Sequence, residues 1–379
     1  MKRAWLILAL LLLWPAPGRC ESVQTAVEQQ VATLDLAALT RAQERQSLVQ
    51  GDLSELIRGL AGGKSVMDGP SLLQWLLSGF TDTLRRSLWR VTRLLVPALL
   101  MGVMEQLRGT LTHGAALRAC QYAGLLVVLG FLAADLTEHA ALAKEAISGM
   151  ADTMQALFPL LVTLLAAVGG TASAAFFQPT VVAACGTMTA LIQNATLPLA
   201  TGTAVLTVVG CLCPTLHVDR LRRLFTQAAH WTLGVSFTVF IGVTIVQGLG
   251  TAAVDGVSIR TAKYALDNFI PIVGGMFADT VDTLVGCSLL IKNALGVVGL
   301  LLLVGRMLAP MLQTVCAMLL YRAAAAVLEP VSDSALCRCI GEFSEVFMLL
   351  FIIQLSVGAM FLLLVAQMLV VGNLTVMLR

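Results

Sequence analysis

Charged residues are scarce in this chain, and their scarcity excludes an ordinary soluble domain. Asp, Glu, Lys and Arg make up 12% of the 379 residues, whereas soluble domains carry about 25%. The net charge is only +2 and no basic run with interleaved aromatic residues occurs, so no nucleic-acid partner is expected. Hydrophobic residues account for 58% of the chain, and the few charges lie between apolar blocks. The composition therefore predicts an all-α, polytopic helical membrane protein.

Catalytic and metal-binding motifs are also absent from the sequence. It has no Walker A loop, H-E-x-x-H, G-x-S-x-G or Rossmann glycine fingerprint, and its four histidines do not pair at ligand spacing. Two close cysteine pairs occur, Cys211/Cys213 and Cys337/Cys339, but a one-residue gap makes a poor chelate. We therefore expect no enzyme activity, no cofactor and no metal, and any energy input must come from a partner.

The first twenty residues have the pattern of a signal peptide. Two basic residues precede the apolar run AWLILALLLLW (4–14), and PAPGRC (15–20) then supplies helix breakers and small residues. Cleavage is expected after Gly18 or Cys20. An uncleaved anchor is the alternative, and both place the following residues outside the cytoplasm.

Residues 21–91 form the expected extracytoplasmic region of amphipathic helices. Apolar residues recur at three- and four-residue steps early in this region, a turn-rich break follows at 59–70, and 71–91 is a second amphipathic helix. Trp75 and Trp89, together with four arginines, suit the membrane interface. These helices either lie on the bilayer or on partners, or pack on the protein's own membrane domain.

Residues 92–379 are expected to form a multi-pass transmembrane domain. The apolar blocks that predict its spans are 92–108, 119–137, 155–173, 180–195, 197–216, 230–253, 290–305, 307–328 and 343–371. Several blocks are shorter than the roughly 20 residues of a straight span, so tilted, paired or re-entrant segments are the alternative for these, and a count within two of nine is expected.

Alternation of these spans from an external N-terminus assigns the charged segments to two sides. It puts Arg108–Arg118 and Arg220–Arg223 inside, in agreement with the positive-inside rule. It puts the acidic residues from Asp135 to Glu145 and from Glu329 to Glu342 outside. The exception is Arg85–Arg93, which an interfacial helix with snorkelling arginines tolerates.

Two apolar stretches share an order of aromatic residue, Pro, apolar run and Gly-Gly. They are FPLLVTLLAAVGGTASAAFFQP (158–179), with Pro159, Gly169 and Gly170, and FIPIVGGMF (269–277). A weak repeat of broken helices is one interpretation, since transport proteins place such breaks at mid-membrane. Close helix packing through small residues is the preferred interpretation.

The second stretch opens a segment, 269–292, that we expect to be a broken, amphipathic helix. Proline and glycine weaken the helix, and a fresh helix is expected from about Met276. The residues of possible functional importance here are Pro271, Gly274, Gly275, Asp279, Asp282, Thr283 and Gly286, of which Gly275 and the last four share one face. The two carboxylates either stabilise a helix N-terminus, line a polar conduit, bind a coupling cation or contact a partner protein.

The stretches MQALFPLLVTLLAAVGGTASAAFFQP (154–179) and KYALDNFIPIVGGMFADTVDTLVGCSLLIKNALG (263–296) resemble the stage III sporulation protein AE family of endospore-forming bacteria. The resemblance implies a protein of the mother-cell membrane around the forespore. It also implies companion stage III sporulation membrane proteins, among them a secretion-type ATPase, and a channel partner in the forespore. No catalytic residue carries over from the family.

The function expected from this resemblance is that of a non-enzymatic component of a secretion-like channel between mother cell and forespore, needed for forespore development after engulfment. The alternative is a stand-alone secondary transporter in which Asp279 and Asp282 bind an ion. Such a protein is expected to have a clearer two-fold repeat and several buried ionisable residues. Lys292 and Arg306 are the other candidates, but each lies near a predicted span end where snorkelling suffices.

Overall fold

The computed structural model describes residues 31, 36–44, 52–63, 69–106, 114–213, 215–269, 274–330 and 334–377. Within these ranges every regular element is a helix, which confirms the all-α fold class. The expected signal peptide lies outside the described residues and stays a prediction. The helices are α3 (Ala37–Glu44), α4 (Leu53–Ala61), α5 (Gly69–Gln106), α6 (Gly114–Ala167), α7 (Thr171–Leu191), the π-helical turn η2 (Ile192–Thr196), α8 (Leu197–Leu212), α9 (Asp219–Phe269), α10 (Gly274–Leu328) and α11 (Ser334–Met377).

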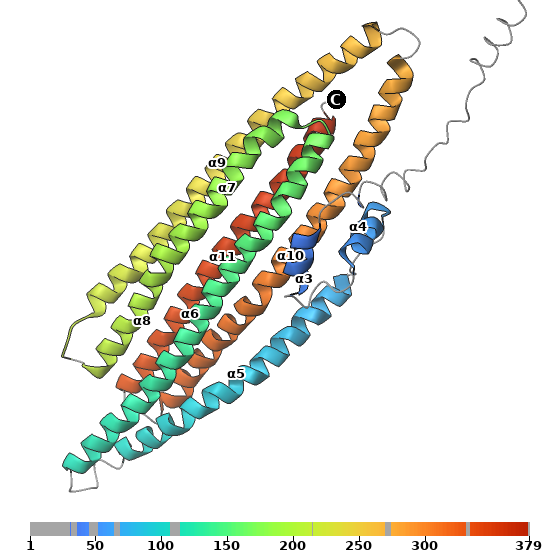
Figure 1. Ribbon diagram of the computed structural model, residues 1–379. Coiled ribbons are helices and arrows are strands. Elements are labelled where there is room, and N and C mark those ends of the chain that lie inside the picture. Colours follow the sequence, from blue (N-terminus) through green and yellow to red (C-terminus); the bar gives the residue numbers. More distant parts are fainter. Residues whose placement is uncertain are drawn as a thin grey trace, which may run out of the picture.

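Long antiparallel helices make up an elongated bundle (Figure 1). Helices α6, α9 and α11 run in one direction, whereas α10 and the continuous rod of α7, η2 and α8 run in the other. Five segments of the described chain are long and apolar enough to cross a membrane: Tyr122–Ala167, Thr171–Leu212, Asp219–Gly248, Thr283–Leu328 and Leu336–Leu374. The prediction of a helical membrane protein is thus supported, although the expectation of nine separate spans is wrong.

Expected spans merge because the residues between them continue the helix. The expected pair 119–137 and 155–173 falls largely within α6, since the intervening EHAALAKEAISGMADT (138–153) is polar yet rich in good helix formers. Arg306 alone separates two expected spans inside α10, and η2 joins α7 to α8 ahead of Pro198. Helix α5 likewise runs through the expected domain boundary at residue 91.

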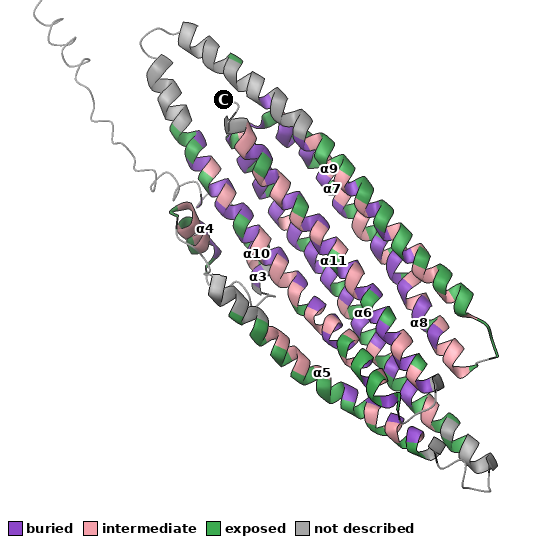
Figure 2. Ribbon diagram, turned by 180° about the vertical axis from the view of Figure 1, so that it is seen from behind, coloured by how far each residue is buried: buried purple, intermediate pink, exposed green. Residues whose placement is uncertain are grey.

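Helices α10 and α11 form the core of the bundle. Their membrane-length segments are more than half buried, whereas most of the corresponding segment of α9 is exposed (Figure 2). Small residues allow the close approach: a side chain at Gly299 would collide with Leu157 of α6, and one at Gly296 with Leu369 of α11. Because α10 and α11 are surrounded, the outer helices present the faces that meet lipid, water or partners.

The short helices α3 and α4 pack on the protein's own bundle, as one of the two sequence interpretations held. Helix α4 packs on α10 and α3 on α6, with Leu53 and Ile57 of α4 fully buried. Asp52 caps α4 by accepting a hydrogen bond from the Ser54 amide at 3.0 Å. This bond holds the pKa of the exposed Asp52 carboxyl below its usual value.

Candidate functional sites in the bundle

The first Gly-Gly pair forms the turn between α6 and α7, and the N-terminus of α7 binds a buried carboxylate. Gly169 has a φ of 103°, a left-handed conformation that favours glycine, and Gly170 is the N-cap of α7. The amides of Ala172 and Ser173 donate to Asp255 of α9 at 2.8 and 3.0 Å. The side chain of Asp255 is fully buried, so the N-terminal dipole and two charged hydrogen bonds offset its desolvation.

This geometry revises the interpretation of the first motif. The helix break is a turn between α6 and α7 that follows Ala167, and α6 continues through Pro159. Gly170 is buried and packs closely on Leu165, in line with the preferred packing interpretation. Sequence reasoning missed Asp255 because it lies more than 80 residues further along the chain.

The second motif lies where α9 ends and α10 begins, towards the end of the bundle that holds the α6/α7 turn and the end of α11 (Figure 1). A new helix begins at Gly274, close to the expected start. Pro271 lies outside the described residues. Thr283 and Gly286 are exposed.

Gly275, Asp279 and Asp282 are part of α10, but the side chains of the two aspartates lie outside the described residues. The proposal that they form a functional face therefore stays a prediction.

Lys292 lies five turns into α10 and is fully buried, so the expectation that it snorkels at a span end is wrong. Its Nζ donates to the carbonyl oxygen of Leu369 in α11 at 3.0 Å. On the next residue, Asn293 Nδ2 donates to Asn373 Oδ1 at 3.2 Å. These bonds join α10 and α11, and Gly372 leaves the space that the lysine fills.

A cluster of ion pairs and hydrogen bonds joins α5 to α6 and α6 to α10. Arg90 Nη1 lies 2.9 Å from Glu138 and 3.5 Å from Asp135. The hydroxyl of Tyr321 donates to Asp135 at 2.6 Å. Phe347 of α11 then stacks on Tyr321, with ring centroids 5.0 Å apart. The cluster runs from the buried Tyr321 to the exposed Glu138 and does not lie in an external loop, because the expected loop around Asp135 is part of α6.

At the opposite end of the bundle, Arg222 of α9 lies 3.7 Å from Glu342 and 3.2 Å from Glu345 of α11. The expectation that Arg220–Arg223 and Glu342 lie on opposite sides of the membrane is therefore wrong. The merging of expected spans into single helices changed the number of crossings between them. A cavity of 660 Å³ beside this pair is lined by three arginines, Arg222, Arg322 and Arg338.

One cysteine of each close pair meets at this end. Cys211 of α8 and Cys339 of α11 form a disulfide with their Cα atoms 5.9 Å apart. Considering each pair separately missed this link across 128 residues. Within the described residues no three His, Cys, Asp or Glu side chains lie together as a metal site would need.

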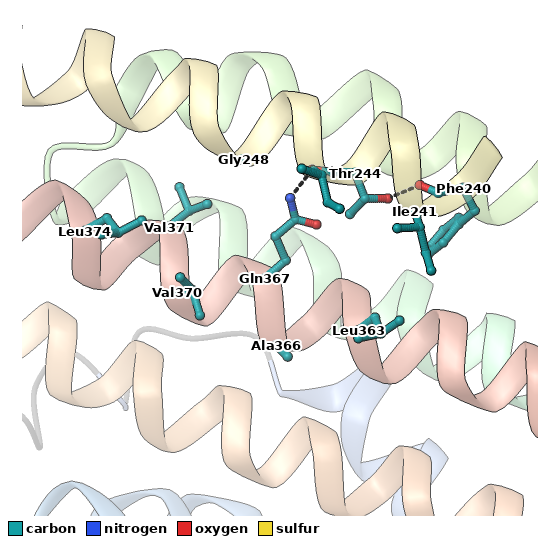
Figure 3. A pocket seen from close by; sticks show the side chains of 11 residues that line it. Phe240, Ile241, Thr244, Gly248, Leu363, Ala366, Gln367, Val370, Val371 and Leu374 are labelled. Carbon is teal, nitrogen blue, oxygen red and sulfur yellow. Dashed lines mark hydrogen bonds between the residues drawn. The ribbon is translucent and has the colours of Figure 1, made fainter. Parts of the chain in front are cut away.

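An apolar groove of 420 Å³ lies between α9 and α11 (Figure 3). At its centre the Gln367 amide donates to the backbone oxygen of Thr244, and Gly248 leaves room for the Gln367 side chain. The Thr244 hydroxyl donates to the Phe240 carbonyl oxygen. Both polar side chains are thus engaged, and the other lining residues offer the groove only apolar surface.

The fold and these sites define a polytopic helical protein whose long apolar helices suit a membrane. Comparison with known families then identifies it further. The profile of the family "Stage III sporulation protein AE" matches residues 51–372, so the chain belongs to that family. Stage III sporulation protein AE of Bacillus subtilis (strain 168) is 37% identical over 237 residues, which are 62% of this chain and 59% of the relative. No solved structure matches the chain.

Proposed function

We propose that the protein is a non-enzymatic membrane component of a secretion-like channel complex between mother cell and forespore, required after engulfment. The family match over residues 51–372 carries this proposal, because it supports a role in sporulation. The elongated bundle suits a membrane part that works with partners. The chain has no nucleotide-binding motif, so a companion ATPase is the proposed source of energy.

The proposed orientation puts the end of the bundle with Arg222 in the cytoplasm. The described arginines Arg220, Arg222, Arg223, Arg322 and Arg338 all lie near this end, and basic residues mark the cytoplasmic side of membrane proteins. Helix α5 runs from about the middle of the bundle to this end, so residues 21–91 are proposed to start outside the cytoplasm. A reporter fused near residue 60 that is active only in the cytoplasm would contradict this orientation.

Deletion of the gene tests the proposed function. We expect engulfment to finish and forespore gene expression then to fail, with rescue by the full-length chain. Pull-down of the tagged chain from sporulating cells is expected to recover companion membrane proteins and the ATPase. Deletion strains that sporulate at the parental frequency would refute the role.

A stand-alone secondary transporter is the second candidate, because Asp255 and Lys292 are buried ionisable residues on two different helices. Purified protein in vesicles separates the two candidates. A transporter moves solute without companions, and Asp279→Asn with Asp282→Asn abolishes that movement. A channel component shows no transport alone.

A further inference from the structure

The outward face of α6 carries a polar stripe that runs the length of a membrane crossing. From Thr137 to Thr163 the exposed residues of α6 recur every three or four positions, and only Ala141 and Pro159 among them are apolar. The members that carry the argument, here called the α6 stripe, are Glu138, Lys144, Glu145, Ser148, Asp152 and Gln155. At 1.5 Å per residue the run of exposed residues from Thr137 to Thr163 is about 39 Å long, longer than the roughly 30 Å of bilayer hydrocarbon, and the α6 stripe covers about 26 Å of it.

The α6 stripe lies at the same depth as a charge-free part of α9, as contacts with α11 show. Phe347 of α11 contacts His139 of α6, with ring centroids 5.1 Å apart. Two residues earlier, Glu345 of α11 pairs with Arg222 of α9. Gln367 bonds Thr244 a full 22 residues, or about 33 Å, further along both α11 and α9. The α9 segment from 224 to 244 therefore spans the same height as α6 from about residue 139 to 159.

At this shared height α9 presents hydrocarbon to its surroundings. Residues 224–254 contain no Asp, Glu, Lys or Arg. Trp231 and Val246 are 74% and 73% exposed, and Val235, Val239 and Val243 lie exposed between them. Such a face is stable in contact with lipid, so we place the bilayer at the height of this part of α9. The α6 stripe is then at bilayer depth, where charged side chains are stable only against water or other polar groups.

The α6 stripe carries three carboxylates and one lysine, and two of the carboxylates are neutralised by arginines of neighbouring helices. Glu138 is paired with Arg90 at 2.9 Å, and Glu145 lies 4.0 Å from Arg306. Lys144 and Asp152 are exposed and have no ion-pair partner among the residues that the structure describes. Helix α3 packs on α6, and α4, which exposes Glu55 and Arg58, packs on α10. Unpaired charges at this depth require water, and the balance of signs gives no preference for anions or cations.

We propose that the α6 stripe faces water at bilayer depth and forms one wall of the conduit that the channel complex encloses. This inference rests on the proposed function, and it assigns the opposite side, the exposed face of α9, to lipid. The solutes that it suits are hydrated polar molecules of either charge.

Thiol labelling in membranes of sporulating cells, where the companion proteins are present, tests the proposal. The parent carries Ser at Cys120 and Cys213, the exposed free cysteines among the described residues. Single variants Lys144→Cys, Asp152→Cys and Gln155→Cys are compared with Val235→Cys, Val239→Cys and Val246→Cys. We expect a charged methanethiosulfonate to label the α6 variants about tenfold or more faster, because only a hydrated thiol ionises to the reactive thiolate. The α9 variants should stay at the rate of the parent.

Labelling of the α6 variants as slow as that of the α9 variants would overturn the proposal. Cross-linking of these α6 cysteines to a second copy or to a companion protein would overturn it too, because the stripe would then be a protein interface.

A functional arm fills the stripe with apolar side chains. Ser148→Leu with Gln155→Leu should reduce sporulation at a normal membrane level, whereas Val235→Leu with Val239→Leu should not, and equal sporulation of both would contradict the proposal. Failure of the proposed function gives a different result from failure of this inference. If the proposed function is wrong, a deletion strain sporulates normally, whether or not the thiol reagent labels the stripe.

Discussion

The outer faces of α6 and α9 lie at one height in the bundle, yet they differ in chemistry. Helix α6 exposes Lys144, Glu145 and Asp152, whereas α9 exposes Val235 and Val239. Both segments are long and apolar enough on average to count as membrane spans. Mean hydropathy therefore identifies the helix, while the exposed face alone determines which solvent it can meet. On the proposal above, the protein is two-sided within the plane of the membrane.

The sharpest test of the two sides is the same charge placed on each. Val239 lies at the middle of the charge-free residues 224–254, and Ser148 lies on the α6 stripe. Val239→Lys should cost about 2.5–3.5 kcal/mol of insertion free energy, which lowers the equilibrium constant for insertion roughly 100-fold and so reduces the membrane level. Ser148→Lys should leave the membrane level unchanged. Immunoblots of membrane fractions measure both, and equal losses would remove the distinction between the faces.

A second comparison sets a buried carboxylate against an exposed one. Asp255→Asn removes a charge that accepts from the Ala172 and Ser173 amides, so we expect a loss of about 1.5–3 kcal/mol in the free energy of unfolding. Asp152→Asn on the α6 stripe should lose almost nothing. Thermal unfolding of both variants in detergent measures the difference. Unchanged stability of Asp255→Asn would mean that the amides at the α7 N-terminus do not need the carboxylate.

The smallest expected effect concerns two glutamines. Gln367→Leu removes the bond to the Thr244 carbonyl, and such interhelical bonds in membranes average about 0.6 kcal/mol. Gln155→Leu on the α6 stripe should not reduce the free energy of unfolding, because Gln155 is exposed. The midpoints of unfolding in increasing concentrations of a denaturing detergent distinguish the two variants. A larger loss at Gln155 would show that the stripe is packed against something.

Composition and periodicity were sufficient to predict a helical protein with helices long and apolar enough for a membrane, and α10 begins at Gly274, two residues before the expected start at about Met276. The number of spans was wrong because hydropathy treats residues 138–154 as a polar break, whereas their Ala, Glu, Lys and Leu content continues the helix. The same segment held the signal for the α6 stripe. Once it is a helix, Lys144, Ser148, Asp152 and Gln155 fall on one face.

Other features depend on contacts that sequence spacing does not reveal. Asp255 meets the Gly169–Gly170 turn from another helix, and Cys211 meets Cys339 in the same way. Lys292 was misjudged because its distance from a span end says nothing about its partner, the Leu369 carbonyl oxygen. Each of these pairs is set by the order in which long helices pack, which local patterns do not encode.

The most direct measurement of the two-sided account is the solvent around one residue on each face. Spin labels at Asp152→Cys and Val239→Cys, in the assembled complex within bilayers, are exposed to oxygen, which concentrates in lipid, and to a polar nickel chelate, which stays in water. The account predicts that relaxation at residue 239 responds to oxygen and relaxation at residue 152 to nickel. Oxygen-dominated relaxation at both residues would place the α6 stripe against lipid and contradict the account.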